Sequence, residues 1–176
     1  KITPNIFNVW MNILKNTTKR VLWLLKSNNA ACENIWKTAE KKGIDRNRII
    51  FAERLPHYDH LKRIAHADIF LDTFPYNAHT TASDTIRMGV PIIALMGKSF
   101  ASRVSSSILN QVNMKKLITT NTEDFQNLAI DIATNKNKLK KIKDDLKNSL
   151  LNSSLFDSVK FTKDLETLYQ KILDEK

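Results

Sequence analysis

The sequence contains very little glycine and cysteine, and both shortages limit what the protein can be. Its only glycines are Gly43, Gly89 and Gly97, and no two of them lie close together. A G-x-G-x-x-G dinucleotide fingerprint and a G-x-x-x-x-G-K-[ST] phosphate loop are therefore excluded. If the protein binds phosphate, something other than a glycine-rich loop must hold it. Because Cys32 is the only cysteine, an internal disulfide and a multi-cysteine zinc site are excluded as well.

Long hydrophobic runs are also missing. The longest are Val21–Leu25 and Pro91–Met96, which are far too short to span a bilayer, so no membrane partner is expected. The sequence has no recognisable signal peptide, and a single thiol suits a reducing compartment, so we expect a cytoplasmic location. Because the chain begins with Lys1 rather than methionine, we expect it to be an excerpt of a longer protein.

Negative charge is comparatively scarce. The 176 residues carry 28 Lys and Arg against 18 Asp and Glu, a net charge of +10 that is spread along the chain. Such an excess favours an anionic partner, either nucleic acid, a lipid surface or a phosphorylated small molecule. The alternative is that a lysine-rich surface serves solubility alone. The length is sufficient for one domain with its own core.

Short apolar runs alternate with amphipathic stretches along most of the chain. Strands are predicted at Val21–Leu25, Arg48–Phe51, Ile69–Asp72 and Pro91–Leu95, with a brief edge strand at Leu117–Ile118. Helices are predicted at Ile6–Lys15, Ala30–Lys42, His57–His66, Thr80–Met88, Ser102–Asn110, Glu123–Ala133, Lys138–Leu150 and Phe161–Leu173. This alternation indicates an α/β fold with a doubly wound parallel sheet, followed by C-terminal helices.

The four histidines follow the second and third predicted strands. In an open parallel sheet, ligands bind beyond the carboxyl ends of the strands, so this region is the candidate site. His60 and Arg63 lie three residues apart and share a helix face. An imidazole can stack on a planar base, and a guanidinium can hydrogen-bond to its carbonyl edge. The alternative is an ordinary polar surface helix. A metal site is not expected, because His57, His60 and His66 lack the spacing of zinc ligands.

A second cluster, Asn77 to Asp84, follows the third strand. A helix that begins near Thr80 directs free N–H groups and its positive dipole end out of the sheet edge, which creates an anion site without glycine. The hydroxyls of Thr80 and Thr81 add donors, and Asp84 could accept hydrogen bonds from a ribose diol. The alternative is a capping box formed by Thr81 and Asp84. Asp72, at the end of the strand, is either a base or the cap of the next turn.

At these residues the chain resembles a known family. The runs VLWLL, NRIIF, LPHYDHLKR, ADIFLDTFPYNAHTTASDTIRMGVPII and SFASRVSSSIL are similar, in this order, to the C-terminal half of the O-GlcNAc transferase/SPINDLY family. The resemblance extends through SSLFDSVKFTKDLETLY and covers nearly the whole chain. The HTT-x-x-D motif, with L-D-T before it and A-S-R-V after it, is its most specific part.

The resemblance implies a GT-B fold, in which two Rossmann-like halves face each other across a cleft. Residues 1–176 would form the nucleotide-sugar-binding half, whereas the acceptor half and any tetratricopeptide repeats would lie elsewhere in the protein. The implied activity is metal-independent transfer of a sugar from UDP-GlcNAc, or alternatively from GDP-fucose, to Ser/Thr hydroxyls of a protein acceptor. No prosthetic group is implied. The chain alone is expected to transfer no sugar.

The resemblance also implies roles for individual residues in nucleoside binding. His60 matches a histidine that packs on uracil, and Arg63 matches an arginine near the edge of the base. The backbone around Leu55 matches the segment that reads the base, and Asp84 matches an aspartate that binds ribose. His57 stands where the transferase has a ribose-contacting lysine, so the donor remains open.

The same comparison implies which residues hold the diphosphate. His79, Thr80 and Thr81 match the motif that binds it, and Lys1 matches a lysine that contacts the donor phosphates. Lys1 and His79 would thus be the catalytic residues, because they stabilise the charge that develops on the leaving group. Two other functions compete with this one, namely a basic nucleic-acid-binding domain and a non-catalytic nucleotide-sugar sensor. No nucleic-acid-binding module is recognisable, so the glycosyltransferase is favoured.

Overall fold

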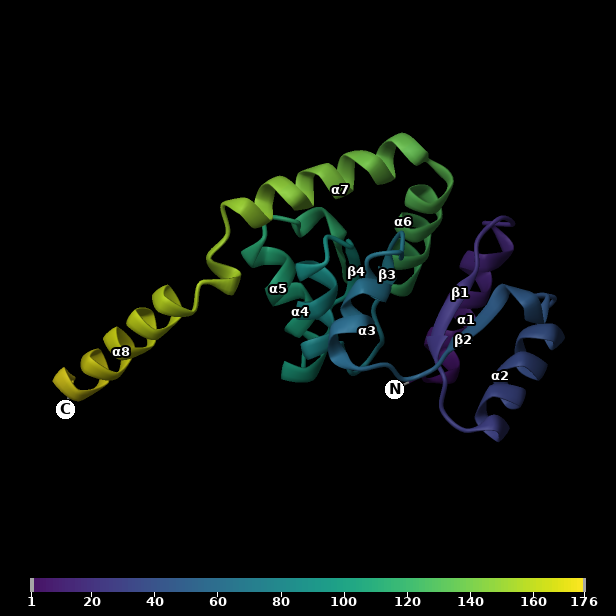
Figure 1. Ribbon diagram of the computed structural model, residues 1–176, viewed down its shortest axis with the longest axis horizontal. Helices are drawn as coiled ribbons and strands as arrows, with labels where there is room; N and C mark the ends of the chain where they lie inside the picture. Colours follow the sequence, from purple (N-terminus) through teal and green to yellow (C-terminus); the bar gives the residue numbers. More distant parts are fainter. Residues whose placement is uncertain (1, 176) are drawn as a thin grey trace.

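The computed structural model describes residues 2–175, which form parallel strands flanked by helices (Figure 1). The strands are β1 (Leu22–Leu25), β2 (Ile49–Ala52), β3 (Phe70–Leu71), β4 (Ile92–Leu95) and β5 (Ile118–Thr119). The helices are α1 (Pro4–Lys15), α2 (Asn29–Lys41), α3 (His57–Ile64), α4 (Thr80–Arg87), α5 (Val104–Gln111), α6 (Thr122–Thr134), α7 (Lys136–Leu151) and α8 (Ser158–Asp174). Short 3₁₀ turns precede β2, α5, β5 and α8.

All strand pairs are parallel, as the alternating pattern predicted, but the strands divide into two ladders. β1 pairs with β2 in a register that places Leu22 opposite Ile49. β3, β4 and β5 form a second ladder in that order, with Phe70 opposite Ile92. Within residues 2–175 no strand joins β1 to β3. The α/β class is therefore confirmed, whereas the expected single sheet is interrupted between these two strands.

Helix ends follow local sequence signals. α2 ends just before Gly43, and α4 ends just before Gly89, where these glycines adopt φ of 78° and 73°. Such positive angles terminate a helix at little cost only where the residue has no Cβ. α1 begins after Thr3, whose hydroxyl accepts a hydrogen bond from the Ile6 N–H. These signals explain why the predicted helix ends agree with the structure to within three residues.

The core lies around β4, whose four residues are all buried. α6 contributes the buried residues Phe125, Ala129 and Ile132, and it also packs against α1. α7 buries Leu139, Ile142 and Leu146, which lie on one face of the helix. A continuous apolar strand with helices on both sides is what a parallel sheet requires.

Two predicted elements differ from the structure. The helix predicted at Ser102–Asn110 divides into a 3₁₀ turn at Phe100–Ser102 and α5, because Ser99 and Ser102 hydrogen-bond to each other within the turn. The strand predicted at Ile69–Asp72 is reduced to Phe70–Leu71. β3 ends at Leu71, although the Asp72 N–H still donates to the Ile93 carbonyl, and the Asp72 carboxylate accepts from N–H groups of the following loop.

α8 extends away from the rest of the chain at the left of Figure 1 and buries none of its residues. Its apolar residues Leu165, Leu168, Tyr169 and Ile172 share one face of the helix, as its sequence spacing indicates, but this face meets no core in the described part of the chain. No helix within residues 2–175 is both long and apolar enough to cross a membrane.

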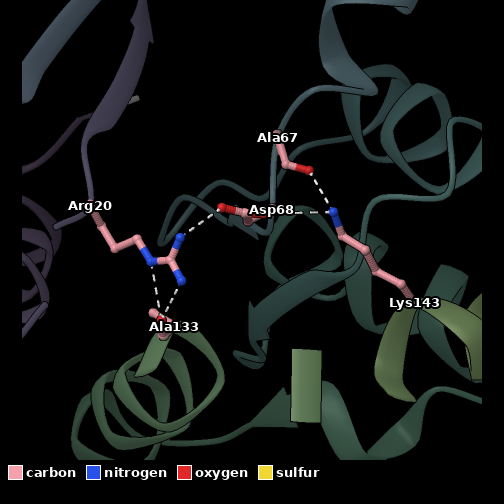
Figure 2. A network of polar contacts seen from close by, with 5 residues as sticks. All are labelled: Arg20, Ala67, Asp68, Ala133 and Lys143. Atoms are coloured by element: carbon pink, nitrogen blue, oxygen red, sulfur yellow. Dashed lines mark hydrogen bonds and ion pairs between the residues drawn. The ribbon is translucent and has the colours of Figure 1, made fainter. Parts of the chain in front are cut away.

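Polar contacts link the two ladders at the amino ends of β1 and β3 (Figure 2). The Arg20 guanidinium forms an ion pair with Asp68 at 3.3 Å and donates twice to the Ala133 carbonyl at the end of α6. Lys143 of α7 donates to the Ala67 carbonyl at 3.1 Å and lies 3.8 Å from Asp68. The turn before β3 is thereby held between β1 and two helices.

Candidate functional site

The loop that follows β3 is ordered by a buried carboxylate. Asp72 Oδ1 accepts hydrogen bonds from the N–H groups of Thr73 and Ala78, both at 2.8 Å. The Asn77 amide donates to the Thr73 carbonyl at 2.9 Å, and the Asn77 N–H donates to the Ala101 carbonyl at 2.8 Å. Asp72 is therefore the cap of this turn, which was one of its two predicted roles. The loop delivers His79 to the start of α4.

α4 begins at Thr80, where the sequence predicted it, and His79 occupies the N-cap position without a capping side chain. The first intrahelical bond runs from the Ser83 N–H to the His79 carbonyl at 3.0 Å, so the N–H groups of Thr80 and Thr81 have no acceptor within the helix. Both threonines are exposed. Since Thr81 lies inside the helix, the alternative capping box with Asp84 does not form.

The His79 ring is held by aromatic contacts. It stacks on Tyr76 with ring centroids 4.9 Å apart, and the Phe100 ring approaches it edge-on at 6.0 Å. Its Nε2 is buried and has no hydrogen-bond partner within residues 2–175. An imidazole fixed in this way retains hydrogen-bonding capacity for a ligand at the start of α4.

On α3, His60 and Arg63 lie in contact, as their spacing predicted. Arg63 Nη2 lies 3.0 Å from His60 Nδ1, and Arg63 Nη1 donates to the Glu53 carbonyl at 2.6 Å. Burial lowers the pKa of the His60 imidazole, and the Arg63 guanidinium lowers it further. The neutral imidazole accepts from Arg63 at Nδ1, so its proton lies on Nε2. Arg63 also lies over the Trp23 ring at 5.3 Å.

The two sequence clusters meet at a contact between α3 and α4. His57 Nε2 lies 3.3 Å from Asp84 Oδ2, although the two residues are 27 positions apart. His57 is largely exposed, whereas the Asp84 side chain is only 16% exposed. The Asp84 carboxylate is thus held against the His57 ring.

The other predicted residues lie at the margin of this site or beyond it. Leu55 is exposed in the loop between β2 and α3. Arg63 donates to the carbonyl of Glu53 in the same loop. His66 lies beyond the end of α3, and within residues 2–175 it forms no hydrogen bond with His57 or His60. Lys1 lies outside the described residues. No group of three potential metal ligands occurs within residues 2–175.

Sequence reasoning missed three contributors. Tyr76 and Phe100 gave no signal, because the ring contacts that make them relevant depend on the fold. Gly97 could have been suspected from the scarcity of glycine, since a Cβ there would lie 2.4 Å from the Ser102 hydroxyl. The close approach of Gly97 to Ser102 positions the turn that carries Phe100.

Parallel strands with polar side chains gathered beyond their carboxyl ends define a Rossmann-like α/β domain. The chain belongs to glycosyl transferase family 41, since the model of that family matches residues 1–165. This confirms the resemblance found in the sequence and does not favour the nucleic-acid-binding alternative.

Among curated relatives, a probable UDP-N-acetylglucosamine–peptide N-acetylglucosaminyltransferase SEC from Arabidopsis thaliana is 36% identical over 98% of this chain. A probable UDP-N-acetylglucosamine–peptide N-acetylglucosaminyltransferase SPINDLY from Eustoma exaltatum subsp. russellianum is 32% identical, also over 98% of this chain. The chain covers only 18% and 19% of these two relatives. It thus spans less than a fifth of their length.

Among solved structures, a mutant of the Thermobaculum terrenum O-GlcNAc transferase superimposes on 97% of this chain with a TM-score of 0.90 and 26% identity. The chain covers 33% of that protein. The match includes nearly all of this chain, so its overall fold resembles that of one part of a protein about three times as long.

Proposed function

We propose that the protein containing this chain is a protein O-glycosyltransferase, and that residues 1–176 are its nucleotide-sugar-binding half. The supporting observation is the contact between His57 and Asp84, which joins the histidine cluster of α3 to the start of α4. The donor is UDP-GlcNAc and the acceptor is a Ser or Thr hydroxyl of another protein. The acceptor half and any tetratricopeptide repeats belong to other parts of a cytoplasmic protein.

Different residues bind the base, the ribose and the diphosphate of the donor in this proposal. The uracil packs on His60, with Arg63 and the backbone near Leu55 at its edge. Asp84 accepts from the ribose hydroxyls, since its carboxylate is oriented by His57. The diphosphate lies at the start of α4, where the N–H groups and hydroxyls of Thr80 and Thr81 and the positive helix end favour an anion.

Sugar transfer breaks the bond between the anomeric carbon and a diphosphate oxygen, and forms a bond from that carbon to the acceptor oxygen. UDP leaves with the electron pair, and the acceptor loses its hydroxyl proton to a base outside this chain. His79 stabilises the leaving diphosphate through Nε2, which the described residues leave without a partner. Lys1 acts on the same phosphates as a cation.

The identity of the donor depends on His57. The SEC and SPINDLY relatives are named for UDP-N-acetylglucosamine, which supports UDP-GlcNAc here. Because a histidine occupies the position of a ribose-contacting lysine, GDP-fucose is the competing donor. Competition between the two nucleotides for the full-length protein would distinguish them.

The test is transfer of labelled GlcNAc by the full-length protein. We expect turnover with UDP-GlcNAc that falls at least about tenfold in Asp84→Asn, because a charged ribose contact is worth about 1.5–3 kcal/mol. The control is Asp59→Asn, an exposed carboxylate on α3. Turnover by the isolated chain, or steeply salt-dependent RNA binding without UDP binding, would contradict the proposal.

A further inference from the structure

Two aromatic rings that contact the His79 imidazole come from loops after different strands. Tyr76 lies in the loop after β3, and its ring is nearly parallel to the imidazole, with an angle of 19° and 4.9 Å between the ring centroids. Phe100 lies in the turn after β4, and its ring is nearly perpendicular to the imidazole, with an angle of 86° and a centroid distance of 6.0 Å. The imidazole is therefore contacted in two different geometries.

Burial in the core does not explain the position of these two rings. The Phe100 side chain is 81% exposed and the Tyr76 side chain is 46% exposed, whereas most large apolar rings of the chain lie in or against the core. Burial of apolar area therefore contributes little to holding either ring in place. The contact that both rings share is the one with His79.

Backbone hydrogen bonds fix the position of Tyr76. Its carbonyl accepts from the Thr73 hydroxyl at 2.6 Å. The N–H of the next residue, Asn77, donates to the Ala101 carbonyl at 2.8 Å. Because Ala101 directly follows Phe100, this bond ties the loop that carries one ring to the turn that carries the other.

The backbone that leads into His79 is held equally firmly. The Ala78 N–H donates to Asp72 Oδ1 at 2.8 Å, and the Ala78 carbonyl accepts from the Ser105 hydroxyl at 3.0 Å. What remains free is rotation of the His79 side chain, and the second side-chain torsion of a histidine has a broad distribution. Such a rotation tilts the imidazole out of the plane parallel to the Tyr76 ring, so the stacking opposes it.

We propose that Tyr76 is a positioning residue for the donor diphosphate. Its ring holds the imidazole so that Nε2, which is buried and has no partner within residues 2–175, is presented to a phosphate oxygen at the start of α4. Phe100 supports the imidazole from a second direction. This inference rests on the glycosyltransferase function proposed above. Because Tyr76 acts through His79 and not on the sugar, its removal weakens binding of UDP itself.

The test is titration calorimetry of the full-length protein with UDP. We expect Tyr76→Ala to bind UDP about 3- to 10-fold more weakly than the wild type, the size of effect that one aromatic contact supplies. Tyr76→Phe keeps the ring and should bind within about twofold of the wild type. The control is Tyr58→Ala, which removes an exposed ring that lies against Lys62 on α3 and should leave UDP affinity unchanged.

A double-mutant cycle separates positioning from a general structural role. In a His79→Ala background the imidazole is gone, so we expect Tyr76→Ala to cause no further loss of UDP affinity. If Tyr76 merely stabilised the loop, its replacement would weaken UDP binding by the same factor with and without His79.

Three results would overturn the positioning role. They are wild-type UDP affinity in Tyr76→Ala, an equal loss in both backgrounds, and a loss for UDP-GlcNAc without one for UDP, which would assign Tyr76 to the sugar. Each of these leaves the proposed function intact, because the wild type still binds UDP. Absence of UDP binding by the wild type would instead overturn the proposed function and this inference together.

Discussion

Replacing Asp72 with alanine tests how the candidate site is built. The Asp72 side chain is completely buried, and its Oδ1 accepts from the N–H groups of Thr73 and Ala78, both at 2.8 Å. A hydrogen bond to a charged acceptor contributes about 1.5–3 kcal/mol, and a buried N–H left without an acceptor costs about 1–3 kcal/mol. We expect Asp72→Ala to reduce the free energy of unfolding by about 2–5 kcal/mol.

The assay is urea denaturation of the full-length protein, with UDP affinity measured in parallel. Asp72→Asn keeps an acceptor oxygen and should lose about 1–2 kcal/mol, less than the alanine variant. Asp59→Ala, on an exposed surface, should change stability by less than about 0.5 kcal/mol. Because the loop carries His79, UDP affinity should fall in Asp72→Ala. Equal stability of Asp72→Ala and Asp59→Ala would refute the reasoning.

Three further changes probe other contacts. The pKa of His60 is lowered in the folded state, so the unfolded chain binds more protons as the pH falls. The free energy of unfolding should therefore decrease as the pH drops below about 6.5. Denaturation measured over a range of pH should show a smaller decrease in His60→Gln. Gly97→Ala places a Cβ 2.4 Å from the Ser102 hydroxyl oxygen and 2.8 Å from the Ser102 Cβ, and it should cost about 1–3 kcal/mol in the same assay. His57→Ala removes an exposed contact to Asp84 and should change stability by less than about 1 kcal/mol while weakening UDP binding in calorimetry.

Local patterns predicted most of the secondary structure. α4 begins at Thr80 and stops before Gly89 because both signals lie in the sequence itself. β4 is apolar along its length and is entirely buried, as a central parallel strand should be. The pairing of His60 with Arg63 followed in the same way from helical spacing.

Features that depend on distant segments could not be predicted. The continuous apolar run Val21–Leu25 is typical of a strand covered on both faces, yet Val21 and Leu25 are each 53% exposed, because no described segment covers these side chains. The apolar residues on one face of α8, among them Leu168, Tyr169 and Ile172, are spaced as in a packed helix, but they are exposed in the described part of the chain. The spacing of a stripe reveals the face of a helix and not the surface that it meets.

The candidate site was likewise predicted only in part from the sequence. The sequence placed histidines and threonines after the second and third strands, which are the elements that carry the site. The contact between His57 and Asp84, and the rings of Tyr76 and Phe100 around His79, arise only when loops from different strands converge. The start of α4 presents N–H groups without a helical acceptor and without a glycine-rich loop.

The most direct test of the account is the dissociation constant of UDP for the full-length protein, measured by titration calorimetry in the wild type and in His79→Ala. If His79 and the start of α4 hold the diphosphate, the variant should bind UDP about 10- to 100-fold more weakly, which corresponds to one charged hydrogen bond. His66→Ala, outside the site, should bind like the wild type. Unchanged UDP affinity in His79→Ala, or no UDP binding by the wild type, would contradict the central claim.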